Sequence, residues 1–380
     1  MSKFVIACGG TGGHLSPGIA LAQELSARGH QCTLIITNKN VDKRLAQFYT
    51  DLNFISLQAS TWSKKFWQWP KFFYIQIKNF LRSLRLLKEK SADLTIGFGG
   101  LMNVGVILAS ALLKKPCVLH EANQCPGRAV RLLSYLAKRI YLPEGVNLTK
   151  ISAKTVRNLG FPIRKDIQKI DKWAAREQLN VPKDQRLLVV IGGSQGAKVF
   201  NRWVIENFAK LGSHNINVIC VTGIGRSNKG EIEESYKDGR SAKLIFMPFV
   251  LNMNVLYSAA DLVIGRAGAG TIAELTRCET PSILVPYPFA ADNHQYKNAL
   301  YHERRGSCLL VEQTAIDRLI DETLHLITDD CLLEDMRYNM QQLNHENAVV
   351  LIANDLEQLL KNLRQTSSKR RKPSKRPTRR

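Results

Sequence analysis

The feature that most constrains the fold is a glycine-rich loop that directly follows a short apolar run near the start of the chain. Residues 4–7 are continuously apolar, as in a buried parallel strand, and they lead into GGTGGH at residues 9–14. The glycines let backbone N–H groups turn toward a ligand, and Ser16 and Pro17 predict the start of a helix. A strand, a glycine loop and a helix in this order predict a phosphate site at the positive end of the helix.

The same arrangement occurs again in the second half of the chain. An apolar run at residues 187–191 leads into GGSQG at 192–196, and a matching pair of motifs follows the two loops, DLTIGFGG at 93–100 and DLVIGRAG at 261–268. Such a duplication predicts an α/β protein of two similar halves, each with a parallel sheet, that face each other across a cleft.

The chain is basic, with a formal net charge of +22. Residues 361–380 hold ten Lys and Arg and no acidic residue, and we expect a disordered basic tail at 365–380. The positive charge favours binding to anionic lipid, nucleotide or nucleic acid, but it does not distinguish among these partners. The eight cysteines form no CxxC pair, which indicates reduced thiols and argues against a zinc site. The longest apolar stretch, 104–113, is too short to span a membrane, so we expect a soluble or peripheral protein.

Two common nucleotide-binding classes do not fit the motifs. In a dinucleotide fingerprint counted from Gly10 the third glycine would fall on Leu15, and the end of the second predicted strand (31–37) offers Thr37 and Asn38 in place of an acid. The chain also lacks the P-loop motif GxxxxGK[ST]. NAD binding and P-loop NTPase activity are therefore not expected.

The segment from 62 to 90 combines aromatic residues with lysines. Its helix is expected to cover the sheet with one apolar face made of Phe73, Ile77, Phe80, Leu84 and Leu87. Aromatic rings beside cations suit a lipid interface. The residues predicted to contact the membrane are Trp62, Phe66, Trp67, Trp69, Phe73, Lys64, Lys65 and Lys71.

The second half carries the outline of a nucleotide-sugar site. Ser194 and Gln195 lie on the second glycine loop, where backbone amides can hold a diphosphate, and Glu274 lies on a helix after Gly268, where a carboxylate can accept from a ribose diol. A polar cluster suited to sugar hydroxyls follows the predicted strand 282–286, and it consists of Asp292, Asn293, His294 and Gln295. In the first half, the polar strand ends at 97–100 and 120–123 mark a crevice.

Six motifs in order resemble the MurG family of bacterial N-acetylglucosamine transferases. They are GGTGGH at 9–14, HEAN at 120–123, GFPIR at 160–164, GGSQGA at 192–197, AGAGTIAE at 267–274 and HQYKNA at 294–299. The resemblance runs from residue 4 to about 360. It departs from the family at Ala122, Leu101 and Ala267, where glutamine, an aromatic residue and serine are usual.

The resemblance implies the GT-B fold, two Rossmann-like domains with parallel sheets and an interdomain cleft, and an inverting transfer that requires no metal or cofactor. The expected domains are an acceptor and membrane-facing domain at 1–164, a UDP-GlcNAc-binding domain at 165–340, a C-terminal helix at 341–364 that packs on the first domain, and the tail. The expected substrates are UDP-GlcNAc and the lipid-linked muramyl-peptide acceptor, lipid I, at the cytoplasmic face of the inner membrane. An anionic membrane surface and other cell-wall synthesis proteins are further expected partners, and specific nucleic-acid binding is not expected.

Site residues follow from the motifs that match. The expected donor contacts are Thr11, Gly12, Gly13, Asn123, Arg164, Ser194, Gln195, Val250, Ala269, Gly270, Thr271, Ile272, Ala273, Glu274 and Gln295. The acceptor diphosphate is expected at Gly10, Gly12, Gly13, His14, Gly99 and Gly100. His14 is the favoured general base, because a histidine near its reference pKa suits that role; equally, it could cap the loop or bind acceptor phosphate.

Two alternatives from other classes stay open. An enzyme similar to UDP-GlcNAc 2-epimerase would share the fold without using a lipid acceptor. A nucleic-acid or anionic-surface binder would act through the basic tail.

Overall fold

The computed structural model describes residues 1–10, 12–60, 65–148, 151–152, 155–193, 196–223, 230–236 and 241–371; within these, the side chains of Val41 and of residues 367–371 are not described. The expectations for Thr11, Trp62, Lys64, Ser194, Gln195 and the tail beyond Arg371 therefore lie outside the described residues.

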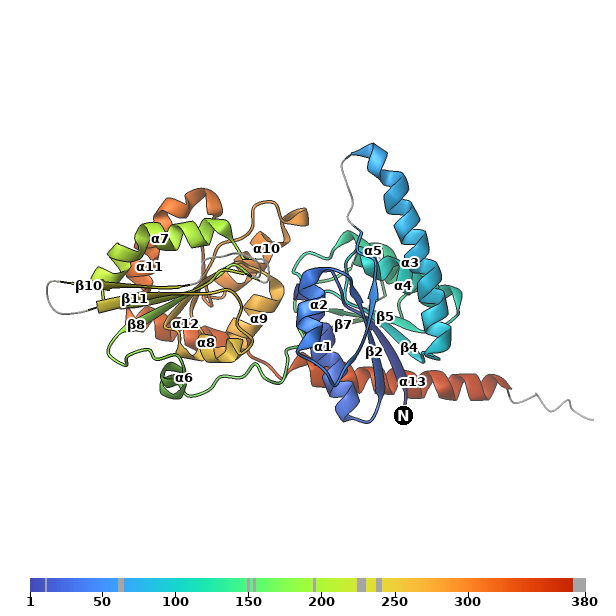
Figure 1. Cartoon of the computed structure of the whole chain (residues 1–380). Helices are drawn as coiled ribbons and strands as arrows, with labels where there is room; N and C mark the ends of the chain where they lie inside the picture. Colours follow the sequence, from blue (N-terminus) through green and yellow to red (C-terminus); the bar gives the residue numbers. More distant parts are fainter. Residues whose placement is uncertain are drawn as a thin grey trace, which may run out of the picture.

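The chain forms two lobes that stand side by side, each built on a seven-stranded sheet (Figure 1). The N-terminal sheet is entirely parallel and has the order β3-β2-β1-β4-β5-β6-β7. Its strands are β1 (Lys3–Ala7), β2 (Gln31–Thr37), β3 (Asn53–Leu57), β4 (Leu94–Gly97), β5 (Cys117–His120), β6 (Arg139–Leu142) and β7 (Val156–Asn158).

The C-terminal sheet has the order β10-β11-β9-β8-β12-β13-β14 and is parallel except for the antiparallel edge pair β10 and β11. Its strands are β8 (Arg186–Ile191), β9 (Ile216–Val221), β10 (Gly230–Ser235), β11 (Ser241–Met247), β12 (Leu262–Gly265), β13 (Ser282–Leu284) and β14 (Leu309–Leu310). The first glycine loop follows β1 and the second follows β8, and each of these strands is central in its sheet. The predicted α/β fold of two similar Rossmann-like halves is confirmed.

The side chains of β1 alternate between the two faces of the sheet and pack against helices on both. Phe4 and Ile6 pack in the core that includes α1 (Gly12–Ala27), whereas Val5 and Ala7 pack on the opposite face of the sheet, beneath α3 (Trp69–Glu89) and α4 (Leu101–Leu112). Successive side chains of a strand point to opposite faces, so a strand covered on both sides must be apolar throughout. The remaining N-terminal helices are α2 (Asn40–Gln47), η1 (Phe66–Gln68), α5 (Arg128–Leu133) and η2 (Ser134–Leu136).

The C-terminal lobe repeats this layering. Leu188 and Val190 of β8 face the core under α7 and α11, and Leu187 and Val189 face the core under α8 and α9. The helices are α6 (Lys172–Gln178), α7 (Lys198–Ser213), α8 (Met253–Ala259), α9 (Ala269–Cys278), η3 (Ala291–Asn293), α10 (His294–Glu303), η4 (Gln313–Arg318), α11 (Leu319–Thr328) and α12 (Asp330–Leu343). Helix α6 lies between the first domain and β8, and its buried Ala175 packs in the C-terminal core.

The last helix, α13 (Ala348–Arg371), returns to the first lobe and runs along its lower side (Figure 1). It packs against α1, and Ile352, Leu356 and Leu360 are buried in the same core as β1. The helix begins at residue 348, later than the expected 341, since α12 extends to Leu343. It also continues to Arg371, so the start of the tail at 365 is corrected: residues 365–371 are helical.

Helix α1 begins five residues earlier than Pro17, the first helical residue that the sequence predicted. It starts at Gly12, and Pro17 lies inside it. A proline early in a helix removes one N–H donor, here the donor to the Gly13 carbonyl, without preventing the first turn from forming. His14 is therefore part of the first helical turn, and the Gly12 and Gly13 amides lie at the N-terminus of α1.

Helix α3 differs most from its prediction. Its buried residues are Ile75, Asn79, Ser83 and Leu87, whereas Phe73 and Ile77, predicted to face the core, are 51% and 59% exposed. The reason is a close contact with α4: a Cβ added at Gly105 would lie 3.4 Å from the Phe80 backbone nitrogen. Small and amide side chains fill this narrow contact, and the larger apolar side chains are left outside it.

Candidate active site

The glycine loop after β1 is held from below by a carboxylate that sequence inspection missed. Asp42, fully buried in α2, accepts hydrogen bonds from the Gly10 N–H at 2.8 Å, the Thr37 N–H at 3.0 Å and the Thr37 hydroxyl at 2.6 Å. The end of β2 offers Thr37 and Asn38, and the acid comes instead from the following helix. Its negative charge fixes the backbone of the loop.

His14, which ends the first glycine loop, lies beside the second glycine-rich strand end of the first domain. A Cβ added at Gly99 would lie 3.5 Å from the His14 Nε2, and one added at Gly100 would lie 3.3 Å from its Cε1. Both glycines have φ near +80°, a conformation that side chains other than glycine rarely adopt. Burial lowers the pKa of His14 below 6.5, and the charges of Glu121 and Asp42 oppose that shift. The imidazole is thus neutral at pH 7 and lies beside the expected acceptor loops.

The other histidine of this crevice, His120, is held in place by contacts within the protein. His120 bonds through Nε2 to the Gly160 carbonyl at 3.0 Å and contacts the rings of Phe98 and Phe161. Burial lowers its pKa to about 4. It therefore links the crevice to the segment where the chain first leaves the N-terminal domain.

Glu121 organises the loop that carries Asn123. Its Oε1 accepts from the Ala122 and Asn123 backbone N–H groups and from the Asn123 side chain, and its Oε2 accepts from the Gly127 N–H. Across the cleft, Asn298 of α10 donates to the Asn123 side-chain oxygen and accepts from the Gln124 N–H, while also donating to the Ala267 carbonyl. The expected donor residue Asn123 is thus fixed at the contact between the two domains.

Glu274 and Arg164, both expected to contact the donor, lie together. The Arg164 Nη2 is 3.9 Å from the Glu274 Oε1, and the Tyr257 hydroxyl donates to the other Glu274 oxygen at 3.2 Å. Arg164 also donates to the hydroxyl of Tyr49. Burial raises the pKa of Glu274, and the Arg164 charge acts against this. Tyr49 and Tyr257 gave no recognisable sequence signal, because neither belongs to a motif.

The N-terminus of α9 lies next to this pair. Ala269, Gly270 and Thr271 form its first turn, and α9 approaches α1 across the cleft. Each of these helices, α1 and α9, has a glycine-rich first turn whose N-terminus is suited to a diphosphate, and the two helices contact each other. Ile272 and Ala273, by contrast, pack in the C-terminal core, on a face of α9 that does not carry Glu274.

The polar cluster at the start of α10 has partners of its own. Gln295 accepts from the Tyr287 N–H at 2.8 Å, and His294 lies 2.8 Å from the Ala291 carbonyl. Asp292 forms ion pairs with Arg128 and Arg131 of the N-terminal domain at 3.3 and 3.1 Å. Asp292 and Asn293 both have φ of 52°, a strained backbone of the kind found at functional sites.

Val250 belongs to the loop after β11, and the aromatic residue beside it crosses to the other domain. Phe249 stacks on Phe48, which directly follows α2, with ring centroids 5.8 Å apart and planes inclined by 13°. Neither aromatic residue was identified from the sequence.

Aromatic and aliphatic side chains project into solvent from η1 and α3. We call this set the apolar face of α3; it consists of Phe66, Trp67, Trp69, Phe73, Tyr74, Ile77 and Leu81. The adjoining α4 adds exposed Leu101, Leu108 and Leu112, and Lys65 lies over the Trp67 ring. In Figure 1 this end of α3 extends beyond the rest of the N-terminal lobe. Lys71 is also exposed.

No group of three or more His, Cys, Asp or Glu among the described residues has an arrangement that could hold a metal ion. No helix in the described ranges is both long enough and apolar enough to cross a membrane.

Comparison with known proteins identifies the family. The glycosyltransferase family 28 N-terminal domain matches residues 4–142, and the family 28 C-terminal domain matches residues 187–356. A protein of Opitutus terrae, named UDP-N-acetylglucosamine–N-acetylmuramyl-(pentapeptide) pyrophosphoryl-undecaprenol N-acetylglucosamine transferase, is 43% identical over 94% of this chain and 95% of its own length.

Solved structures agree on the fold. The crystal structure of Acinetobacter baumannii MurG has a TM-score of 0.70 at 22% identity and covers 94% of this chain and 99% of its own. A putative UDP-N-acetylglucosamine 2-epimerase from Listeria monocytogenes has a TM-score of 0.63 at 15% identity, covering 89% and 91%. The fold alone therefore does not separate the transferase from the epimerase hypothesis, whereas the sequence relationship does. The chain belongs to glycosyltransferase family 28 and, within it, to the MurG family.

Proposed function

We propose that this enzyme transfers N-acetylglucosamine from UDP-N-acetylglucosamine to the 4-hydroxyl of a lipid-linked N-acetylmuramyl peptide, in the synthesis of peptidoglycan. The observation that carries the proposal is the pairing of the buried Arg164 with Glu274 of α9, a helix that contacts α1, which carries His14 in its first turn. The family membership supports the same reaction.

In this proposal the donor lies against the C-terminal domain. The N-terminus of α9 faces the diphosphate, and Glu274 accepts from the ribose hydroxyls. Helix dipoles and backbone amides stabilise the negative charge that develops on the leaving diphosphate, so the displacement does not require a metal ion. Arg164 adds a positive charge at the same wall of the cleft.

His14 acts as the general base of a single inverting displacement. Its neutral imidazole takes the proton of the acceptor hydroxyl as that oxygen attacks the anomeric carbon and the bond to the diphosphate breaks. Gly99, Gly100 and the amides of Gly12 and Gly13 form the proposed site for the acceptor diphosphate. Asp42 positions the first of these loops.

The experiment measures radiolabelled N-acetylglucosamine transferred from its UDP conjugate to a short-chain lipid I analogue, with and without a chelator. We expect label in the lipid phase for the wild-type enzyme, and a fall in kcat/KM of at least about tenfold for Glu274→Ala, since a charge-assisted hydrogen bond is worth about 1.5–3 kcal/mol. Glu334→Ala, on the exposed surface of α12, is the matched control. Isomerised UDP-sugar with no transfer would replace the proposal by the epimerase hypothesis.

We also infer that the enzyme attaches peripherally to the cytoplasmic face of the plasma membrane through the apolar face of α3. Exposed tryptophan and phenylalanine beside Lys65 and Lys71 suit the boundary between headgroups and acyl chains. An enzyme whose acceptor is anchored in lipid needs its acceptor loops close to that surface.

Sedimentation with phosphatidylglycerol vesicles tests the attachment. Ile77→Ser is expected to weaken vesicle binding several-fold, because it removes apolar surface that enters the interface. Ile205→Ser is the matched control, since Ile205 of α7 is 51% exposed on the other domain, compared with 59% for Ile77. Equal loss of binding in both variants would contradict the inferred surface.

A further inference from the structure

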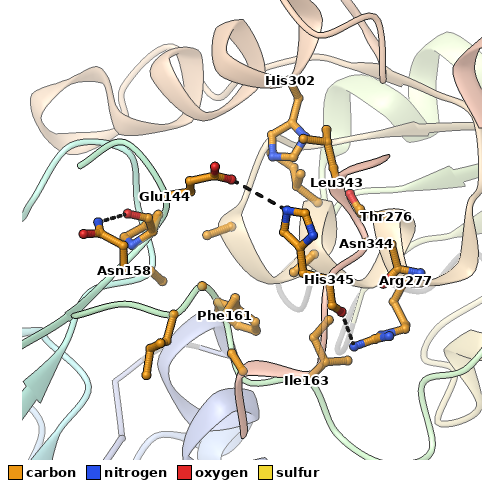
Figure 2. Close-up of a pocket in the computed structure, with 18 of the residues that line it drawn as sticks. Glu144, Asn158, Phe161, Ile163, Thr276, Arg277, His302, Leu343, Asn344 and His345 are labelled. Carbon is orange, nitrogen blue, oxygen red and sulfur yellow. Dashed lines mark hydrogen bonds and ion pairs between the residues drawn. The ribbon is translucent and has the colours of Figure 1, made fainter. Parts of the chain in front are cut away.

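A cavity of about 370 Å³ lies where the chain crosses between the two domains (Figure 2). The chain crosses twice, first near Gly160 and again between α12 and α13, and both crossings line the cavity. The crossings touch: a Cβ added at Gly160 would lie 3.9 Å from the Cβ of Ala348. Asn347 also braces them, accepting from the Ile163 N–H at 3.2 Å and donating to the Ile163 carbonyl at 2.9 Å.

Most of helix α9 lies between this cavity and Glu274 of the proposed donor site, and Ala269 in its first turn also lines the cavity. The α9 residues that line the cavity are spaced as one helical face, namely Ala269, Ile272, Ala273, Thr276 and Arg277. Glu274 does not line it and instead contacts Tyr257 and Arg164. A molecule in this hinge cavity would therefore contact a different face of α9 from a ribose held by Glu274.

The wall of the hinge cavity is mainly apolar, with Leu159, Phe161, Ile163, Leu343 and Leu351 supplied by both crossings and by α13. A cavity of this size, with mostly apolar walls and a few polar groups, is typical of small-molecule sites. Thr276 is 7% exposed, and its hydroxyl has no hydrogen-bond partner among the described residues. A buried hydroxyl without a partner costs free energy unless a bound molecule satisfies it.

The acidic and arginine side chains that line the cavity are Arg277, Glu144 and Glu346, and Arg277 lies on the opposite side of it from Glu144 (Figure 2). The Arg277 guanidinium bonds to the His345 carbonyl at 3.4 Å, and no carboxylate in the described part of the chain forms an ion pair with it. The carboxylate of Glu144 already has partners, His345 at 4.0 Å and the Tyr301 hydroxyl at 3.4 Å. Burial lowers the pKa of His302 to about 4, so its imidazole is neutral at pH 7. Arg277 is thus the cation that remains available to a ligand.

We propose that the hinge cavity binds an amphipathic anion, with its apolar body between Phe161 and Leu351 and its acidic group at Arg277, and that its occupancy restrains the movement of the two domains. Both crossings and α9 line the cavity, so any change in the angle between the domains changes its shape. A ligand that fits one shape stabilises the corresponding angle. The cleft must open and close around donor and product, so the bound anion slows turnover.

The binding test uses 1-anilinonaphthalene-8-sulfonate, which combines aromatic rings with one sulfonate, and follows its fluorescence with the full chain. We expect saturable binding that Leu351→Trp weakens at least tenfold by filling the cavity and that Arg277→Gln weakens several-fold. Arg304→Gln, at an exposed arginine directly after α10, is the matched control. The Ile77→Ser variant shows how much of the dye binds to the apolar face of α3 instead of the cavity. Saturating UDP is expected to leave the amount of dye bound in the hinge cavity unchanged.

Equal dye affinity in the wild type and in Leu351→Trp would overturn the proposal, and so would full displacement of the dye by UDP. Circular dichroism and the melting temperature check that Leu351→Trp is folded; if it is not, unchanged affinity in Arg277→Gln overturns the proposal by itself. In the transfer assay, which rests on the proposed function, saturating dye is expected to lower kcat at least twofold in the wild type and not in Leu351→Trp. The binding result stands without that activity, so failure of either proposal can be distinguished.

Discussion

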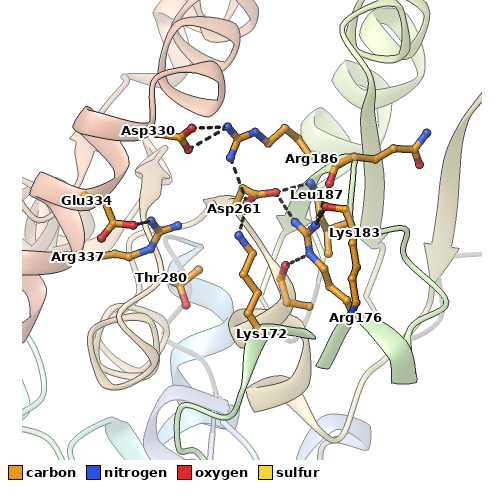
Figure 3. Close-up of polar contacts among 12 residues, drawn as sticks. Lys172, Arg176, Lys183, Arg186, Leu187, Asp261, Thr280, Asp330, Glu334 and Arg337 are labelled. Atoms are coloured by element: carbon orange, nitrogen blue, oxygen red, sulfur yellow. Dashed lines mark hydrogen bonds and ion pairs between the residues drawn. The ribbon is translucent and has the colours of Figure 1, made fainter. Parts of the chain in front are cut away.

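At the scale of single residues, two aspartates in equivalent motifs have different environments. Asp261, in DLVIG, is 1% exposed, pairs with Arg176, and accepts from the Leu187 N–H (Figure 3). Lys172 and Arg186 complete its surroundings. Asp93, in DLTIG, accepts from the Lys3 N–H and lies 3.6 Å from Arg364, with its side chain 37% exposed. The motif repeats, but only one copy is a buried ion pair.

This difference in burial predicts that an Asp→Asn substitution lowers the free energy of unfolding by different amounts at the two positions. Asp261→Asn is expected to lower the free energy of unfolding by about 3–5 kcal/mol, because it leaves the buried Arg176 charge uncompensated. Asp93→Asn, the matched control, is expected to cost about 1 kcal/mol or less at its partly exposed site. Urea unfolding of both variants measures the difference. Similar losses in the two would show that burial of Asp261 does not determine its contribution.

His14 predicts a pH dependence. Burial lowers the pKa of its imidazole below the usual 6.5, and a general base must be unprotonated to act. The kcat/KM for transfer is therefore expected to hold as the pH falls to 6.5 and to decline only below it, as His14 becomes protonated. His14→Gln should remove this acid limb together with most of the activity, whereas His214→Gln, on the exposed surface after α7, should change neither. An acid limb centred above pH 6.5 would argue against His14 as the base.

At the scale of elements, the two longest helices show how packing selects a face. In α3 the pattern of large apolar residues suggested one core face, but the narrow contact at Gly105 admits Asn79 and Ser83 and leaves Ile77 outside. In α13 the side chains of Ile352, Leu356 and Leu360 are buried in the core that includes α1, and Leu363 packs against that core. Beyond this point Arg364 bonds to Ser2 and lies near Asp93.

Deletion of residues 365–380 is therefore expected to leave folding and turnover in detergent intact. The deletion removes eight Lys and Arg, and each cation near an anionic membrane contributes about 1 kcal/mol, so binding to anionic vesicles should weaken at low salt. Truncation before Leu356 is the contrasting variant, because it also removes Leu359 and Leu360 from the core and should destabilise the N-terminal domain. Loss of turnover with the fold intact in the shorter deletion would assign the tail a role in the reaction.

At the scale of the whole molecule, a small number of contacts set the relation of the two domains. Asn298 bonds to Asn123 and Gln124 on one side of the cleft and to the Ala267 carbonyl on the other. The stacked rings of Phe48 and Phe249 and the ion pairs of Asp292 are further contacts between the lobes.

Asn298→Ala is expected to lower kcat about tenfold while reducing stability by only about 1–3 kcal/mol, because it leaves polar groups at the domain contact without partners. Asn207→Ala is the matched control, since the Asn207 amide also donates to a backbone carbonyl but within α7. Steady-state kinetics and urea unfolding of the two variants make the comparison. An equal effect of both on kcat would rule out a specific role for the interdomain contact.

The sequence by itself determined the class of fold and the edge of each sheet where a site can form. Continuous apolar runs such as residues 187–191 can only be buried strands, and a glycine loop at the end of such a run can only present backbone amides, because these properties depend on neighbouring residues alone. The motifs around His14, Arg164 and Glu274 likewise identified the family.

Tertiary structure alone decided which distant residues meet. Asp42 beneath the first glycine loop, Tyr49 at Arg164 and Asn298 at Asn123 come from elements with no shared motif, and their contacts exist only once the chain has folded. The same holds for the exposed side of α3 and for the hinge cavity, which is enclosed by segments near residues 160 and 345. Local pattern fixes what an element is, whereas packing against its neighbours fixes which of its faces is buried and what that face contacts.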